Sequence, residues 1–207
     1  MLILNKNILT IGGNRLEGGP LTPPTPDPYN PLGLPSNTIR VKFSSGYTPS
    51  IGDSQTLVDS TTNVWDIYKS SNNWSSLLNR NTNLLEVLGA NTTNVTNMSS
   101  MFNSCSNLTS VQLFNTSSVT DMSSMFIGCE SLTTIQLYDT SSVTDMSSML
   151  ENCYNVESGA LELYRQASSQ TNPPTSHTDT FKYCGELTVM GYTILNQIPE
   201  SWGGYGA

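Results

Sequence analysis

The chain has 207 residues, a formal net charge of −8 and a charged fraction of only 12%. That length allows one domain with a real core plus an appendage. All but two of the eight basic residues lie at or before Arg80, which argues against nucleic acid or an anionic membrane as a partner. No segment has the roughly 20 consecutive apolar residues of a membrane span, so we also expect no membrane insertion.

Residues 1–15 are apolar and β-prone, and Gly12 and Gly13 end the segment. They are too few to form a core of their own, so we predict a docking arm that adds as an edge strand to another protein's sheet. The side chains expected to fill apolar pockets there are Leu2, Leu4, Ile8 and Leu9. The segment has neither a basic start nor an unbroken apolar run, so we expect no export signal.

Residues 16–36 form a Pro/Gly-rich linker that contains seven of the eleven prolines. Such a composition is typical of an extended, semi-rigid spacer. A ragged end of the folded domain is the alternative interpretation.

Residues 37–70 are predicted to be an amino-terminal cap. Ile39, Val41 and Phe43 alternate with basic residues, a pattern that indicates a strand with one buried face. Further on, Val64 and Ile67 fall, with the following tyrosine, on one face of a short predicted helix.

A 24-residue repeat occupies residues 71–166, first in degenerate form and then nearly verbatim. Val95, Val119 and Val143 set the period, and methionines and cysteines keep it at Met98, Met122 and Met146, at Met101, Met125 and Met149, and at Cys105, Cys129 and Cys153. A fixed period of this length signals a stack of equivalent supersecondary units.

Within one unit the hydrophobic period changes. Leu132, Ile135 and Leu137 suit the buried face of a short strand, with Gln136 and Tyr138 pointing outward. Downstream, one face of a short helix is predicted to contain Met146, Met149, Leu150 and Cys153. The predicted fold class is an α/β repeat solenoid, a leucine-rich-repeat-like right-handed stack of about five strand–turn–short-helix units with caps and an extended amino-terminal arm.

The segment "NTSSVTDMSSMFIGCESLTTIQLYD" resembles the repeat of the BspA-like leucine-rich-repeat surface proteins. The resemblance covers about a third of the chain clearly and roughly half with degenerate copies. It implies a cell-surface or virion-surface protein that binds rather than catalyses. It brings no functional residues with it, because the shared positions are core and turn residues.

Residues 167–207 are predicted to be a last irregular repeat and a carboxy-terminal cap. Cys184 lies 31 residues after Cys153, so one unit carries a seven-residue insertion. Residues 157–168 fit either a continued strand or a helix, and the stripe of Val156, Ala160, Leu163, Tyr164 and Ala167 fits the helix better.

The cysteines are expected to be free thiols that act as small apolar residues. A disulfide ladder between neighbouring units is the alternative. One histidine and cysteines 24 residues apart do not provide a metal-binding cluster. We therefore expect no cofactor, no metal site and no catalytic residues.

The outward strand positions give the best binding signal, as a rigid surface for protein or glycan contact. The predicted binding face consists of Ser110, Gln112, Phe114, Thr134, Gln136 and Tyr138. The alternative is that the two aromatic rings only stabilise each other. Asp121 and Asp145 are interpreted as helix-start residues, and His177 as a solvated loop residue.

These patterns predict a non-enzymatic, virion-associated structural or recognition protein, such as a phage head or tail decoration. It would dock through residues 1–15 and the linker onto other virion proteins in a multi-copy assembly, and bind a host-surface protein or glycan. The expected location is the virion surface after synthesis in the host cytoplasm. The alternative is a bacterial cell-surface adhesin.

Overall fold

The computed structural model describes residues 9–11, 14–16, 27–112 and 114–206. Leu2, Leu4 and Ile8 of the predicted arm lie outside these residues. Leu9 lies in β1 (Leu9–Ile11), which pairs in antiparallel fashion with β2 (Asn14–Leu16). This part of the arm therefore forms a small hairpin.

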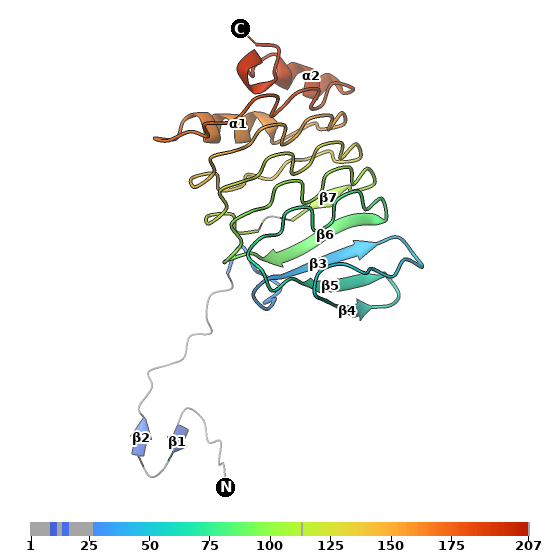
Figure 1. Ribbon diagram of the computed structural model, residues 1–207, viewed down its shortest axis with the longest axis vertical. Helices are drawn as coiled ribbons and strands as arrows, with labels where there is room; N and C mark the ends of the chain where they lie inside the picture. The colour runs from blue at the N-terminus through green and yellow to red at the C-terminus, as the bar shows by residue number, and fades with distance from the viewer. Residues whose placement is uncertain (1–8, 12–13, 17–26, 113, 207) are drawn as a thin grey trace.

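One mixed sheet of five strands forms the amino-terminal end of the body (Figure 1). In spatial order it contains β4 (Ser54–Asp59), β5 (Val64–Tyr68), β3 (Thr38–Phe43), β6 (Leu84–Asn91) and β7 (Ser110–Val111). The β6–β7 pair is parallel and the other pairs are antiparallel.

The strand predicted from the alternation of Ile39, Val41 and Phe43 is confirmed as β3, with those three side chains buried. The helix predicted over Val64 and Ile67 is wrong, because this segment is β5. Its central position between β3 and β4 explains the outcome: pairing on both edges overrides a weak helical pattern.

The predicted fold class is wrong. Apart from the β1–β2 hairpin, the described residues form one mixed five-stranded sheet with two short helices, α1 (Ala160–Ser168) and α2 (Val189–Leu195), and not a solenoid of strand–turn–helix units. Among the described residues from 94 to 156, regular structure is limited to the two residues of β7, and the stretch predicted as a helix after residue 142 consists of turns.

Left-handed backbone conformations explain the missing helices. Ser76, Ser100, Ser124 and Ser148 have φ values of 53–58°, and four residues after each the backbone is again left-handed, at Arg80, Ser104, Gly128 and Asn152. A left-handed residue ends a right-handed helix after one turn. The apolar spacing that resembles a helix face therefore arises from consecutive turns.

These turns lie over one another in what we call turn layers, residues 73–81, 97–105, 121–129, 145–153 and 176–184. Parallel bridges join Asn73, Asn97, Asp121, Asp145 and Ser176 in that order. The amide N–H groups of Met98, Ser100 and Phe102 donate to carbonyls of the next layer at 2.9 Å. The bridge from Asp145 to Ser176 confirms the seven-residue insertion before the last layer.

The core runs through the layers and under the sheet. Met98, Met122, Met146 and the equivalent phenylalanines and cysteines are 0% exposed. At the carboxy-terminal end, α1 confirms the helical alternative for residues 157–168 and crosses the predicted boundary at residue 166. Trp202 of the short 3-10 helix Glu200–Trp202 covers the last layer beside Tyr164 and Phe181.

Candidate binding surface

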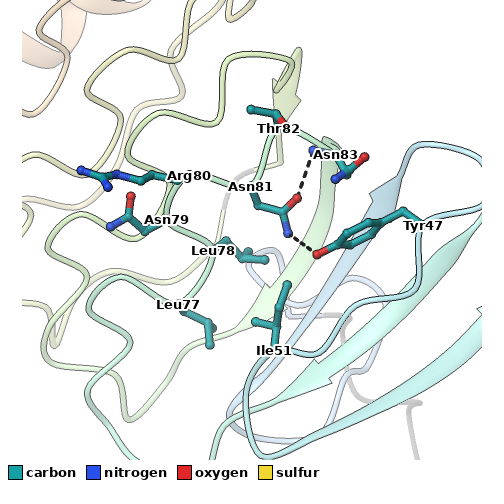
Figure 2. A pocket seen from close by; sticks show the side chains of 9 residues that line it. All are labelled: Tyr47, Ile51, Leu77, Leu78, Asn79, Arg80, Asn81, Thr82 and Asn83. Carbon is teal, nitrogen blue, oxygen red and sulfur yellow. Dashed lines mark hydrogen bonds between the residues drawn. The ribbon is translucent and has the colours of Figure 1, made fainter.

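Two cavities lie beside the sheet, and Tyr47 lines both; the smaller one is also lined by residues of the first turn layer. The smaller has a volume of about 260 Å³ and is drawn in Figure 2. The larger, of about 420 Å³, opens over the strands and is lined by Lys42, Trp65 and Leu57 together with the loop 45–48 and the turn 60–63.

Two contacts hold the Tyr47 side chain between the cavities. Its ring packs on Phe43 with centroids 4.9 Å apart. Its hydroxyl accepts a hydrogen bond from Asn81 Nδ2 at 3.1 Å, and Figure 2 shows the two side chains facing each other. Ile51 and Leu77 form the apolar side of the smaller cavity.

Asn81 occupies the place in the first layer that a cysteine occupies in the later ones. Its Oδ1 accepts from the backbone N–H of Asn83 at 3.0 Å, and Asn83 Oδ1 accepts from Ser44 Oγ at 2.8 Å. The buried thiol column therefore ends here in a polar network that contacts the loop after β3. Asn81 also lines the smaller cavity.

Asn63 holds the residues around the larger cavity in place by hydrogen bonds. Its backbone is left-handed (φ 54°), and its Nδ2 donates to the carbonyls of Ser44 and Tyr47 at 2.7 and 2.8 Å. Its Oδ1 accepts from Trp65 Nε1 at 2.8 Å, which sets the orientation of the half-buried indole. One side chain thus positions both aromatic residues of the site before any ligand arrives.

Charge at this surface is limited. Lys42 Nζ is 2.5 Å from Glu86 Oε1, so the one cation of the larger cavity is already paired. Arg80 lies at the rim of the smaller cavity and extends away from Tyr47 (Figure 2). Hydroxyl, amide and aromatic groups dominate the remaining lining, a chemistry that suits neutral, hydroxyl-rich ligands.

The structure corrects the predicted binding face. Phe114 and Tyr138 are 0% and 1% exposed, with ring centroids 5.5 Å apart, so they stack in the core and do not point outward. Leu137, expected to be buried, is 52% exposed. The reason is that residues 132–138 form no strand, so side chains do not alternate between two faces.

The polar members of that face stay near the surface. Gln112 and Thr134 are exposed, and Ser110 and Gln136 are partly buried. Without the two rings they do not form an aromatic platform. The sequence analysis did not identify the residues around the two cavities at Tyr47. The segment from Asn63 to Asp66, in which Trp65 lies beside polar residues, could have indicated a polar turn next to an aromatic residue.

Two further interpretations change. Asp121 and Asp145 accept hydrogen bonds at Oδ1 from the N–H of Ser123 and Ser147, so they stabilise turns and do not start helices. His177 is not simply solvated: it is partly buried and stacks on Trp202 at 4.2 Å. Over the described residues, no group of three or more His, Cys, Asp or Glu side chains is arranged to hold a metal ion.

The prediction of free thiols is confirmed, since all four cysteines are free and buried. Cys105, Cys129 and Cys153 each donate from Sγ to a carbonyl of the preceding layer at 3.0–3.1 Å. Burial raises the pKa of Cys105 and of Cys153 to about 12. Such thiols are poor nucleophiles, because the reactive form is the thiolate.

Neither described helix is long and apolar enough to cross a membrane. The family model described as "Mycoplasma protein of unknown function, DUF285" matches residues 55–184, more than half of the chain. The match includes the repeats and the Trp65 side of the larger cavity, whereas Lys42 and Tyr47 precede it. Searches of the curated proteins and of the solved structures found no significant match.

Proposed function

Because the chain belongs to this DUF285 family, whose function is unknown, we propose a function from its own geometry: a non-enzymatic surface recognition protein that binds glycans. The proposed binding site is the pair of cavities around Tyr47. The amino-terminal arm and linker attach the protein to a larger multi-copy assembly, which we propose to be a phage virion.

The main support for a recognition role is that Asn63 holds both Tyr47 and Trp65 in place by hydrogen bonds without any ligand. A sugar ring binds through its C–H face on an aromatic ring and through its hydroxyls on amides and hydroxyl groups. The larger cavity offers an indole, the hydroxyls of Thr48 and Ser60 and a volume of about 420 Å³, within the usual size of small-ligand sites. A concave site of this size favours a saccharide over a flat protein surface.

The absence of carboxylate, histidine and cysteine side chains from the lining supports binding over catalysis. The residues lining the two cavities, all in the described part of the chain, include no carboxylate, histidine or cysteine. Hydrolysis of a glycosidic bond ordinarily requires a pair of carboxyl groups. The site therefore has groups to hold a saccharide and none of the usual groups to cleave it.

A bacterial cell-surface adhesin is the second candidate. The description of the matching family refers to Mycoplasma, a cellular organism, which favours a cellular over a viral location. Antibody labelling of purified particles and of intact cells distinguishes the two, since a virion protein labels particles and an adhesin labels cells.

Tryptophan fluorescence tests the recognition role. Trp74 and Trp202 are 0% and 6% exposed, so a saccharide bound in the larger cavity should change mainly the emission of Trp65. Oligosaccharides that bind on an array should shift this emission, and Trp65→Ala or Asn63→Ala should weaken binding at least tenfold. Tyr192→Ser, an exposed position at the other end of the body, is the matched control. Array binding that survives both site variants would refute the proposed site.

A further inference from the structure

The outer edge of β4 has no strand partner among the described residues. β4 ends the sheet order, and β5 pairs with its inner edge only. An open edge of this kind presents unpaired N–H and C=O groups that can accept a further strand. A bulge at Val58 ends the regular part, so the acceptor segment is Ser54–Leu57.

The usual protection against edge pairing is weak here. The acceptor segment Ser54–Leu57 contains no charged residue and no proline, and Leu57 and Val58 are 45% and 44% exposed. Natural proteins normally place charges or prolines on such strands. The exposed apolar side chains favour a further strand that covers this edge when the protein is assembled.

The β1–β2 hairpin is a suitable occupant. A two-stranded hairpin alone is at best marginally stable in water and needs a sheet or a helix to pack on. Residues 1–16 contain Lys6 and Arg15 and no acid, whereas Asp53 precedes β4 and Asp59 is its last residue, and β4 has no base. Lys69 already pairs with Asp53 at 3.6 Å, which leaves Asp59 for a cation of the arm.

The place where the linker enters the body favours a second copy. Leu32 lies over Gly89, and Asn91 Nδ2 donates to the carbonyl of Leu34 at 2.8 Å, so the chain joins the body at β6. From β6 to the far side of β4 is four strand spacings, about 19 Å. Residues 17–26 include Pro20, Pro23, Pro24 and Pro26. At about 3.1 Å per residue this spacer is long enough for the distance, but it would have to cross over its own sheet to reach that edge. A hairpin from a neighbouring copy has no such restriction.

We propose that the hairpin β1–β2 of one copy adds to the β4 edge of a second copy, which joins the chains head to tail. This inference rests on the docking role proposed for the arm and names the acceptor. Backbone hydrogen bonds supply affinity, and Leu57 and Val58 supply the apolar contact.

Complementation tests this pairing in the full-length chain. An arm variant, Leu9→Pro with Leu16→Pro, removes the donor, and an edge variant, Leu57→Lys with Val58→Lys, blocks the acceptor. Light scattering should show wild-type mass that grows with concentration and monomers for either variant alone. The 1:1 mixture should form a dimer of twice the monomer mass, because it retains one intact donor and one intact acceptor. Leu137→Lys, at an exposed leucine outside the sheet, should behave as wild type.

Three results would overturn the proposal. A monomeric wild-type chain whose β4 amides are protected from hydrogen exchange, with protection lost in the arm variant, would mean that the hairpin docks on its own copy. A monomer with unprotected β4 amides would mean that the edge stays open. Oligomers that persist in the arm variant would mean a different interface. Saccharide binding is read from Trp65 in the wild-type chain and in the arm variant, which changes no residue that lines either cavity. It therefore succeeds or fails independently of these outcomes.

Discussion

At the scale of single residues, the left-handed serines are the feature that most affects stability. Serine pays a conformational penalty of roughly 1 kcal/mol in the left-handed region, which glycine does not. Gly128 already occupies one of these positions, where the neighbouring layers have Ser104 and Asn152. The repeated fold therefore tolerates an unfavourable residue at most of these sites.

Replacing Ser124 by Gly should therefore stabilise the protein by about 0.5–1 kcal/mol, although glycine usually destabilises. Ser106, whose φ is not positive, provides the control, and Ser106→Gly should destabilise by a similar amount. Urea midpoints at constant m-value measure both effects. The same sign for both variants would contradict the proposed role of the left-handed turn.

The buried thiols predict a loss of stability in alkaline solution. The folded Cys153 thiol keeps its proton up to a pKa of about 12 because of burial, whereas an unfolded thiol releases it near pH 8.5. The unfolding free energy contributed by this thiol is thus complete below about pH 8.5 and decreases as the pH rises toward 12. Between pH 8 and 10 the loss is about 2 kcal/mol.

Cys153→Ala should show a shallower decline than wild type over this interval, even though it is less stable at pH 7. Unfolding by urea at pH 7, 8, 9 and 10 measures the slope. Ser141→Ala, an exposed position, should keep the wild-type slope. Equal slopes for wild type and Cys153→Ala would show that the thiol ionises in the folded protein.

At the scale of elements, α2 is placed by a close contact between two glycines. A Cβ added at Gly191 would lie 2.3 Å from the carbonyl oxygen of Gly185 and 2.5 Å from that of Val156. The helix therefore rests directly on the backbone of the last layer. Its opposite side, with Val189 and Met190, is exposed.

Gly191→Ala should destabilise the protein by roughly 1–3 kcal/mol, because the added methyl group forces α2 off the layer. Helix propensity alone would give the opposite sign, a gain of about 1 kcal/mol. Thr193→Ala on the exposed side controls for propensity and should be nearly neutral or stabilising. A thermal midpoint for Gly191→Ala at or above wild type would disprove the close packing.

Secondary-structure elements were predicted correctly where the hydrophobic pattern was compatible with only one kind of element. The alternation before Phe43 gave β3, and the stripe from Ala160 to Ala167 gave α1. The short helices failed because spacing alone does not distinguish a helix face from consecutive turns with left-handed serines. The binding site around Tyr47 was not predicted because Tyr47 contacts Asn63 and Asn81, 16 and 34 residues further along the chain, only in the folded protein. No local pattern specifies these contacts.

At the scale of the whole molecule, the direction of the hydrogen bonds between layers matters. The amides of Met146, Ser148 and Leu150 donate to the carbonyls of Ser176, Thr178 and Thr180, and the N–H of Phe181 donates to Trp202. Each layer thus depends on the chain that follows it. Unpaired buried amides are costly, at roughly 1–3 kcal/mol each.

A chain ending at Gln170 should therefore lose cooperative unfolding, since several buried amides and the Phe181–Trp202 packing lose their partners. A chain that begins at Asp27 should keep the thermal midpoint that the wild-type chain has at low concentration, where it is monomeric. The reason is that the five-stranded sheet and the layers lie within residues 27–206. Circular dichroism melting measures both. A sharp transition near the wild-type temperature in the chain ending at Gln170 would show that the other layers fold without the last one.

The thiol column has a consequence for where the protein can work. Cys105, Cys129, Cys153 and Cys184 are at most 1% exposed, and an oxidant has no access to them in the folded state. Folding then requires no disulfide bond at these four cysteines. A reducing and an oxidising medium should therefore leave the four thiols of the folded protein in the same state.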